Sequence, residues 1–189
     1  MPIHRHPHEI EVKFRVVDRP SLEARLLSLG GKGTPPEDEY NMVLDDRKGA
    51  LREKGMALRL RETGGRGLVT LKGKKSVKRG VKTRVEIETE VDLPRRMLSV
   101  FEALGYETRF RYEKRRATWT FDDPSRPVVV VDETPIGLFA EIEGDEGGIR
   151  RLAAELGVRE EQFLEDSYLS LYRIAREKDP SLPPDMVFR

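Results

Sequence analysis

Residues 8–14 read His-Glu-Ile-Glu-Val-Lys-Phe, a run in which charged and apolar residues alternate. Side chains along a β-strand point alternately to opposite faces of the sheet. Glu9, Glu11 and Lys13 therefore share one face of a predicted strand, and the apolar residues between them share the other. We expect the apolar face to pack in a core and the charged face to remain polar.

The same alternation returns in later segments, which glycine- and proline-containing turns separate. Apolar residues at helical spacing lie between some of them, as with Leu22, Leu26 and Leu29. The predicted strands cover residues 8–17, 39–45, 56–62, 67–74, 81–91, 110–121, 127–132 and 138–143. The predicted helices cover residues 21–29, 94–104, 149–156 and 160–178. This pattern predicts one α+β domain over residues 1–189, with about eight antiparallel strands and a loose tail at 179–189.

Composition excludes several classes of protein. The 189 residues include no cysteine, which excludes thiol nucleophiles and zinc–thiolate sites, and no apolar run of the roughly 20 residues that a spanning helix needs. The first residues lack the apolar segment of a secretory signal, so we expect a cytoplasmic protein without a membrane partner. With 35 Lys+Arg against 34 Asp+Glu, the net charge of +1 argues against nucleic acid as a partner.

Charged residues make up 37% of the chain, against about 25% in an average protein. One interpretation is a thermophile-like surface of ion pairs, and another is that both signs gather in one site. The polar faces of the predicted strands bear on this choice, because they hold almost only Glu, Asp, Lys and Arg. Like-charge neighbours such as Glu9/Glu11 and Arg59/Arg61 repel each other unless a counter-ion or ligand lies between them.

Two arrangements of these strands remain open. In the first, the sheet has one solvated face and one face packed on helices. In the second, the sheet curls into a barrel with its apolar face outward, and the charged side chains line the interior. The positive members of that set are Lys13, Arg59, Arg61, Lys72, Lys74, Arg84, Lys114 and Arg116. The negative members are Glu9, Glu11, Glu86, Glu88, Asp132, Glu141 and Glu143.

A charged interior of this kind suits one class of ligand. Arginine and lysine bind phosphate oxygens, and arginine does so through two parallel hydrogen bonds. Carboxylates would repel a polyphosphate unless Mg²⁺ or Mn²⁺ bridged them to it, and these hard cations prefer oxygen ligands. The residue set therefore predicts a linear polyphosphate bound with a divalent metal, and phosphoryl or nucleotidyl transfer as the reaction.

The order of the charged motifs resembles that of the CYTH, or triphosphate tunnel metalloenzyme, superfamily. The first motif is the Glu-x-Glu-x-Lys pattern of residues 9–13. The later motifs are Ala-Leu-Arg-Leu-Arg at 57–61, Thr-Leu-Lys-Gly at 70–73, Arg-Val-Glu-Ile-Glu at 84–88, Glu-Lys-Arg-Arg at 113–116 and the segment from Asp132 to Glu143. The resemblance covers about residues 8–175, which would be the core of the domain.

The resemblance implies an eight-stranded antiparallel β-barrel, a tunnel that binds triphosphate, with helices packed outside. It implies that Glu9, Glu11, Glu141 and Glu143 hold Mg²⁺ or Mn²⁺, with help from Glu86, Glu88 or Asp132. It also implies phosphate binding by Lys13, Arg59, Arg61, Lys72, Arg84, Lys114 and Arg116. Glu9, Glu11 and Lys13 are the predicted catalytic residues.

Within the superfamily, the sequence is most similar to class IV adenylate cyclases, which convert ATP to cyclic AMP and pyrophosphate. An inorganic tripolyphosphatase or a thiamine triphosphatase would use the same tunnel, so ATP, tripolyphosphate and other organic triphosphates are all candidate substrates. A non-catalytic polyphosphate-binding module is a further alternative. The family resemblance also suggests a homodimer.

Other segments allow two interpretations each. Residues 73–80 can form a basic lid over the tunnel or an ordinary hairpin loop. His4, His6 and His8 would share one face of a strand and could bind a metal, although a terminal tail beside Pro7 explains them more simply. Tyr112 is a candidate for stacking on a base, whereas Trp119 and Phe121 fall on the apolar face and are expected in the core.

Overall fold

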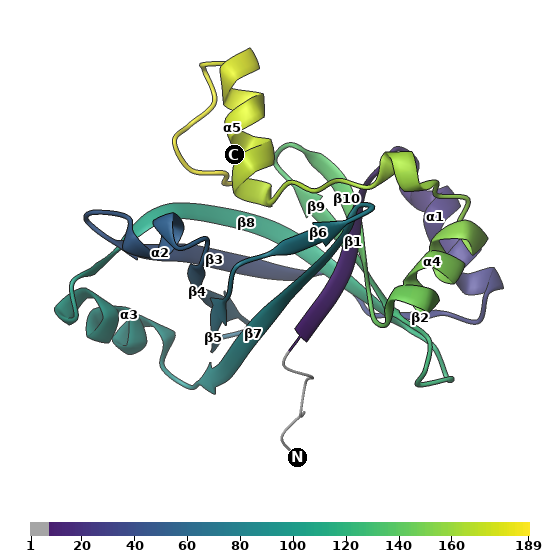
Figure 1. The fold of residues 1–189 in the computed structure, drawn as a ribbon, viewed down its shortest axis with the longest axis horizontal. Coiled ribbons are helices and arrows are strands. Elements are labelled where there is room, and N and C mark those ends of the chain that lie inside the picture. The colour runs from purple at the N-terminus through teal and green to yellow at the C-terminus, as the bar shows by residue number, and fades with distance from the viewer. Residues whose placement is uncertain (1–7) are drawn as a thin grey trace.

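The computed structural model describes residues 8–189 and is built around a closed antiparallel β-barrel (Figure 1). The circuit runs β1, β10, β9, β8, β3, β4, β5 and β7, and β7 pairs back with β1. The short β2 and β6 pair with β8 and β7 outside this circuit. The predicted α+β fold with an eight-stranded antiparallel barrel is confirmed. The strands span His8–Val16 (β1), Lys32–Gly33 (β2), Glu37–Asp46 (β3), Ala57–Thr63 (β4), Arg66–Lys72 (β5), Ser76–Lys78 (β6), Val81–Val91 (β7), Tyr106–Thr120 (β8), Val128–Thr134 (β9) and Gly137–Glu143 (β10).

The helices lie outside the barrel (Figure 1). α1 (Arg19–Ser28) and α4 (Glu146–Glu155) are neighbours at one end of the view, and α3 (Pro94–Ala103) lies at the other. The short α2 (Ala50–Glu53) follows β3, a 3₁₀ turn covers Glu160–Gln162, and α5 (Tyr168–Lys178) ends the regular structure. Asp18 begins α1 by accepting a hydrogen bond from the Ser21 backbone N–H.

Most of the apolar strand faces point outward and pack under these helices, although Val85 and Ile87 of β7 remain exposed. Val12 and Phe14 of β1 join one core with Leu152 of α4, and Leu60 of β4 joins another with Phe101 of α3. Burial of these faces is the main favourable contribution to folding, because each large apolar side chain gains about 1.5–3 kcal/mol on leaving water. The charged faces are thereby turned into the barrel, as the second of the two arrangements required.

The strand register places opposite charges side by side around the barrel wall. Directly paired positions include Glu9–Arg84, Lys13–Glu141, Arg116–Asp132, Lys114–Glu39 and Lys72–Glu86. Each such pair is a favourable cross-strand interaction. Glu11 of β1 faces Glu143 of β10 in the same register, and this like-charge pair is unfavourable unless a cation lies nearby.

The prediction of one helix over residues 160–178 is wrong. The chain is extended from Phe163 onward, and the Leu164 N–H donates a 2.7 Å hydrogen bond to the Lys13 carbonyl of β1. The Ser167 hydroxyl then accepts a bond from the Ser170 N–H and begins α5. This pairing with β1 interrupts the predicted helix. The spacing of apolar residues over 160–178 did not by itself indicate the break.

The predicted loose tail at 179–189 is also corrected by the structure. The Met186 side chain is fully buried, its N–H donates to the Arg111 carbonyl, and its own carbonyl accepts from the Glu113 N–H. The Arg111 N–H donates to Asp185 at 2.8 Å. β8 has a free edge here that needs backbone partners, and the tail supplies them.

Residues 73–80 contain a real strand. β6 pairs with β7, and the connection at Arg79 and Gly80 has positive φ at both residues, as tight hairpin turns require. β5 ends at Lys72, so the exposed Lys74 side chain leaves the wall and lies beside Gly55. The prediction that the strand continues to residue 74 and that Lys74 lines the interior is therefore wrong. Among the described residues, no helix is long and apolar enough to cross a membrane.

Candidate active site

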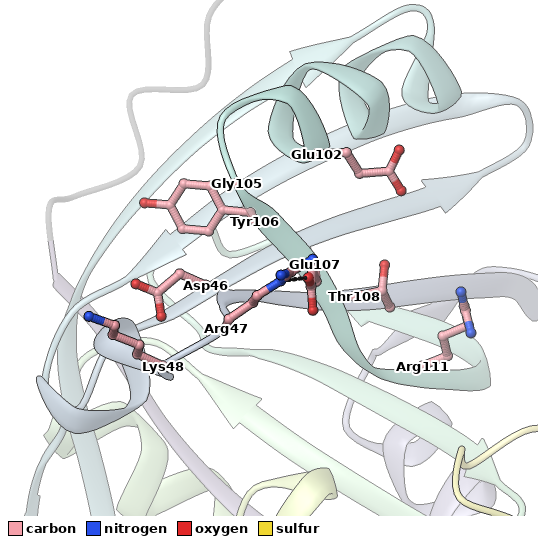
Figure 2. A pocket seen from close by; sticks show the side chains of 9 residues that line it. All are labelled: Asp46, Arg47, Lys48, Glu102, Gly105, Tyr106, Glu107, Thr108 and Arg111. Atoms are coloured by element: carbon pink, nitrogen blue, oxygen red, sulfur yellow. Dashed lines mark hydrogen bonds and ion pairs between the residues drawn. The ribbon is translucent and has the colours of Figure 1, made fainter.

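A cavity of about 360 Å³ lies inside the barrel, and side chains from all eight strands of the circuit line it. It falls within the usual size range of small-molecule sites. A larger and more open hollow of about 780 Å³ lies outside, between β3 and the start of β8 (Figure 2). Its Arg47 and Glu107 are already paired with each other at 2.7 Å. The enclosed cavity, where most of the predicted residues meet, is the candidate site.

Three carboxylates gather at one end of this cavity. Glu9, Glu11 and Glu143 each offer one oxygen, and these oxygens all lie within 4.8 Å of one another. Oxygens on opposite sides of a Mg²⁺ ion are about 4.2 Å apart, because each Mg–O contact is about 2.1 Å. Adjacent oxygens are closer, at about 3.0 Å, so this trio, which we call the acidic group, would surround one ion after each oxygen moved inward by up to about an ångström.

Glu143 is the member of the acidic group that is electrostatically strained without a cation. Burial raises the pKa of Glu143, Arg116 opposes this shift, and the carboxylates of Glu141, Glu11 and Glu9 add to it, so that the pKa is about 7. A carboxyl group with such a pKa is held among negative neighbours without enough positive charge. The residues present thus fit a divalent cation with oxygen ligands.

Basic side chains surround the acidic group and already contact its members. The Glu9 carboxylate accepts a hydrogen bond of 3.2 Å from Lys72 and one of 3.1 Å from Arg84. Lys82, which is buried, lies 3.3 Å from Glu11. The sequence analysis missed Lys82, although it precedes Arg84 by two residues and so shares its strand face. Extending the alternation of β7 by one step would have found it.

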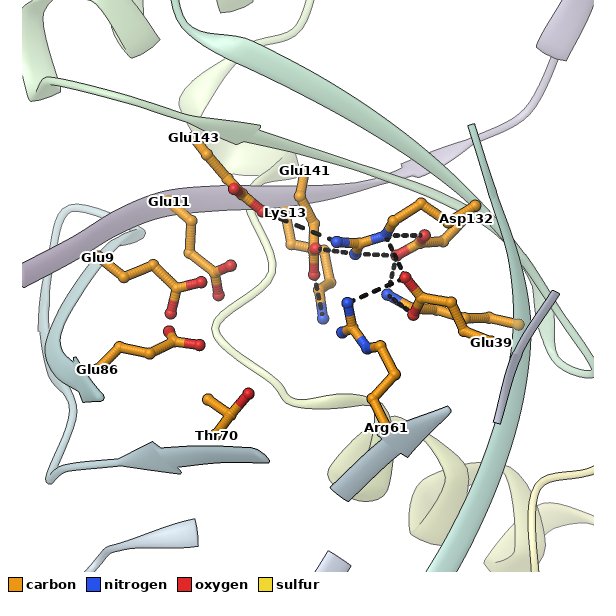
Figure 3. A network of polar contacts seen from close by, with 12 residues as sticks. Glu9, Glu11, Lys13, Glu39, Arg61, Thr70, Glu86, Asp132, Glu141 and Glu143 are labelled. Atoms are coloured by element: carbon orange, nitrogen blue, oxygen red, sulfur yellow. Dashed lines mark hydrogen bonds and ion pairs between the residues drawn. The ribbon is translucent and has the colours of Figure 1, made fainter. Parts of the chain in front are cut away.

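A second network fills the other side of the cavity (Figure 3). Asp132 is fully buried and accepts two 2.7 Å hydrogen bonds from Arg116, one of 3.0 Å from Lys114 and one of 2.6 Å from the Tyr168 hydroxyl. Burial alone would raise the pKa of Asp132, but the charges of Arg116 and Lys114 lower it to about 2. Its acceptor positions are occupied by protein donors at hydrogen-bond distance, whereas Glu143 of the acidic group lies 3.9 Å from Arg116.

Glu141 and Glu39 complete this second network. Glu141 is 3.0 Å from Lys13 and 2.6 Å from Arg116. Glu39 is 3.0 Å from Arg61, and its other oxygen is 3.3 Å from Lys114. Glu39 was missed, because its strand face continues with Asn41 and Val43 instead of further charges. Only its pairing opposite Lys114 places it in the tunnel.

The remaining predicted wall residues meet near Arg59. Its guanidinium donates to Thr70 at 3.1 Å and lies 3.8 Å from Glu88 and 4.0 Å from Glu86. It also contacts the Tyr112 hydroxyl at 3.4 Å. Burial raises the pKa of Tyr112, but the charges of Arg59, Lys114 and Arg61 lower it to about 8.

The structure brings nearly all of the predicted site residues to this cavity, and Asp132 lies just behind its wall. Trp119 is buried in the core, and Phe121 packs against it, as expected. His8 is exposed and belongs to no metal-binding group among the described residues, whereas His4 and His6 lie outside them.

Comparison with known proteins identifies the family. The CYTH domain model matches residues 7–177. The chain belongs to the CYTH family. The predicted superfamily is thereby confirmed, and this CYTH protein carries the residues of its tunnel on the strands described above.

Individual relatives of this CYTH protein carry names that refer to two activities. It is 26% identical over 173 residues to a Methanocaldococcus jannaschii protein named as a candidate adenylate cyclase, covering 86% of this chain and 97% of that one. A solved Vibrio parahaemolyticus structure, also named as a candidate adenylate cyclase, superposes with a TM-score of 0.77 at 21% identity, over 89% of this chain and 99% of that one. A solved Hippeastrum structure is described as a candidate adenylyl cyclase with a dominant triphosphatase activity. It superposes with a TM-score of 0.68 at 20% identity, over 88% of this chain and 96% of that one.

Proposed function

We propose that this protein is an Mg²⁺- or Mn²⁺-dependent enzyme that acts on a triphosphate inside the tunnel, and that it converts ATP to cyclic AMP and pyrophosphate. The observation that carries the proposal is the acidic group of Glu9, Glu11 and Glu143 set among Lys72, Lys82 and Arg84. A metal and a polyphosphate satisfy both sets of charges together.

The chain's own residues would divide the work between binding and orientation. Glu9, Glu11 and Glu143 would hold the metal, which supplies charge neutralisation at the phosphate oxygens. Once Glu9 is committed to the metal, Arg84 loses this partner and Lys72 retains Glu86 at 3.0 Å, so both cations have a weaker hold on carboxylate and are more available to phosphate. Metal and triphosphate should therefore bind cooperatively.

Asp132 has a different role in this proposal from that of the acidic group. Its oxygens are taken by Arg116, Lys114 and Tyr168, so we assign it to holding these side chains and not to the metal. Glu141 likewise pairs with Lys13 and Arg116. Arg61, Lys114 and Arg116 would bind phosphate from this side of the cavity.

The lining of the cavity favours an organic triphosphate over an inorganic one. Leu68, Val128 and Val130 line the cavity together with the charged residues. A nucleoside can cover such apolar side chains, whereas tripolyphosphate has no apolar group to do so. In the proposed reaction the ribose 3′-hydroxyl loses its proton to water as its oxygen attacks the α-phosphorus, and pyrophosphate leaves with the electron pair of the broken P–O bond.

The test is to incubate the protein with ATP or tripolyphosphate, each with Mg²⁺ or Mn²⁺, and to identify the products by ³¹P NMR and chromatography. Cyclic AMP and pyrophosphate are expected from ATP, with no product in excess chelator. Orthophosphate from tripolyphosphate without a cyclic product from ATP would instead establish a triphosphatase, the activity named for the Hippeastrum protein. Binding without turnover of either compound would contradict an enzymatic role and leave a polyphosphate-binding module.

A further inference from the structure

Tyr168, the first residue of α5, projects from outside the barrel circuit into the charged cavity. Its hydroxyl donates a 2.6 Å hydrogen bond to Asp132, and the Lys13 ammonium lies 3.6 Å from the centre of its ring. Lys114 lies 5.4 Å from the same ring centre. Burial raises the pKa of Tyr168, and Asp132 raises it further, so the phenol stays protonated and remains a donor.

Packing behind Tyr168 fixes the position of α5. Phe139 meets the Tyr168 ring edge-on at 5.5 Å, and Tyr112 lies 6.1 Å away on the tunnel wall. One turn further along α5, Tyr172 is buried, and its hydroxyl lies 2.8 Å from the Pro183 carbonyl and 3.0 Å from the Asp185 carbonyl. The tail segment at 179–189, which lies beyond the matched CYTH region, thus braces the helix from outside.

The Tyr168 hydroxyl and the Tyr168 ring each compete with another group for a charged neighbour, the hydroxyl at Asp132 and the ring at Lys13. The hydroxyl occupies one oxygen of Asp132, the same Oδ2 atom that Lys114 and Arg116 also contact. The ring contacts the Lys13 ammonium, which also pairs with Glu141 at 3.0 Å. Without the hydroxyl, Asp132 should attract Lys114 more strongly. Without the ring, Lys13 should be drawn further toward Glu141 and its other carboxylate neighbours, Glu11 and Asp132.

We propose that Tyr168 is a positioning residue of the tunnel, which keeps the Lys13 and Lys114 ammonium groups available to a bound triphosphate. The inference rests on the proposed function, because it assigns these two lysines to phosphate binding. Tyr168 itself does not need to contact the substrate. It acts through the hydrogen bond to Asp132 and the cation–π contact with Lys13.

The test compares variants at two tyrosines of the same helix. Binding of tripolyphosphate with Mn²⁺ is measured by calorimetry, and the melting temperature is recorded for each variant. Tyr168→Phe should weaken binding about 3- to 10-fold, since it removes one hydrogen bond to a charged group. Tyr168→Leu, which also removes the cation–π partner of Lys13, should weaken it more than about 10-fold. Tyr172→Phe loses a comparable hydroxyl outside the cavity and should lower only the melting temperature.

Each result has a definite meaning. Wild-type affinity in both Tyr168 variants would overturn the inference while leaving the proposed function intact. Equal weakening by Tyr172→Phe and Tyr168→Phe would also overturn it, because docking of α5 alone would then explain the loss. The near-isosteric Tyr168→Phe decides the matter should Tyr168→Leu fail to fold. A wild-type protein that binds neither tripolyphosphate nor ATP would overturn the proposed function together with this inference.

Discussion

The two sides of the tunnel contain the same kinds of residue in opposite electrostatic states. Around Glu143, three carboxylates converge, and the pKa of this group is raised to about 7. Around Asp132, donors from Arg116, Lys114 and Tyr168 saturate one carboxylate, and its pKa is lowered to about 2. On the first side, Glu9 and Glu11 have basic partners but Glu143 has too little positive charge beside it, whereas on the second side the protein neutralises Asp132 fully.

This difference shows that a carboxylate in a charged tunnel is a metal ligand or a structural anchor according to its neighbours. Breaking a saturated network should cost stability, because it leaves buried charges without partners. Removing a carboxylate from the crowded side should cost less stability, because relieved repulsion offsets the lost ion pair, and should mainly cost function. Four experiments separate these outcomes, and they begin with the change expected to have the largest effect.

Asp132→Asn should destabilise the fold by about 3 kcal/mol at neutral pH, because Arg116 and Lys114 lose a buried counter-charge. The folded-state pKa of Asp132 lies below its unfolded value, so its stabilisation is present above that value and is lost as the pH falls through the folded one. The difference in the free energy of unfolding between wild type and variant should therefore shrink as the pH falls from about 4 to about 2. Denaturant titrations across this range measure it. Asp122→Asn, at an exposed site, is the matched control, and an equal loss there would refute the assignment.

Glu9→Gln and Glu11→Gln should each lower turnover more than about 100-fold while largely retaining the fold, because each removes a charged metal ligand. Steady-state rates with ATP or tripolyphosphate and melting temperatures provide the two readouts. Glu102→Gln, at an exposed residue of α3, should match the wild type in both. Unchanged rates in both tunnel variants would rule out this acidic group as the metal site.

Arg61→Ala should raise KM about tenfold and change kcat less, because a charged hydrogen bond to phosphate is lost from binding. Arg61 lies 3.0 Å from Glu39 in the cavity, at a site where phosphate can compete with this carboxylate. Initial rates over a range of substrate concentrations give both constants. Arg96→Ala, exposed on α3, is the control. A KM equal to that of the wild type would show that Arg61 does not bind substrate.

Proton release should report the state of Glu143 when Mn²⁺ binds. At about pH 6 the raised pKa keeps most of this group protonated, so metal binding should release close to one proton, and at about pH 8 almost none. Calorimetry in buffers of different ionisation enthalpy measures this number. In Glu143→Gln the release should disappear, and a release that persists in this variant would assign the proton to another group.

The sequence by itself determined the strands and the faces that carry their charges. The alternation in residues 8–14, 84–88 and 113–116 follows from the two-residue repeat of a strand, which any extended backbone imposes. The interior set, including Glu9, Arg61 and Glu141, could be selected for the same reason. The local pattern did not predict the break in the helix at Phe163 or the docked tail at Met186, because both depend on distant strands that offer backbone partners.

Only the tertiary structure decided which charges meet. Closure of the barrel pairs β1 with both β7 and β10, and this brings Glu11 beside Glu143 and Arg84 beside Glu9. The same closure places Tyr168 on Asp132, from a helix that contributes nothing to the sheet. Charge interactions fall off with distance through space and not along the chain. The sequence could thus name the carboxylates, but only the folded register separates the acidic group from the saturated network.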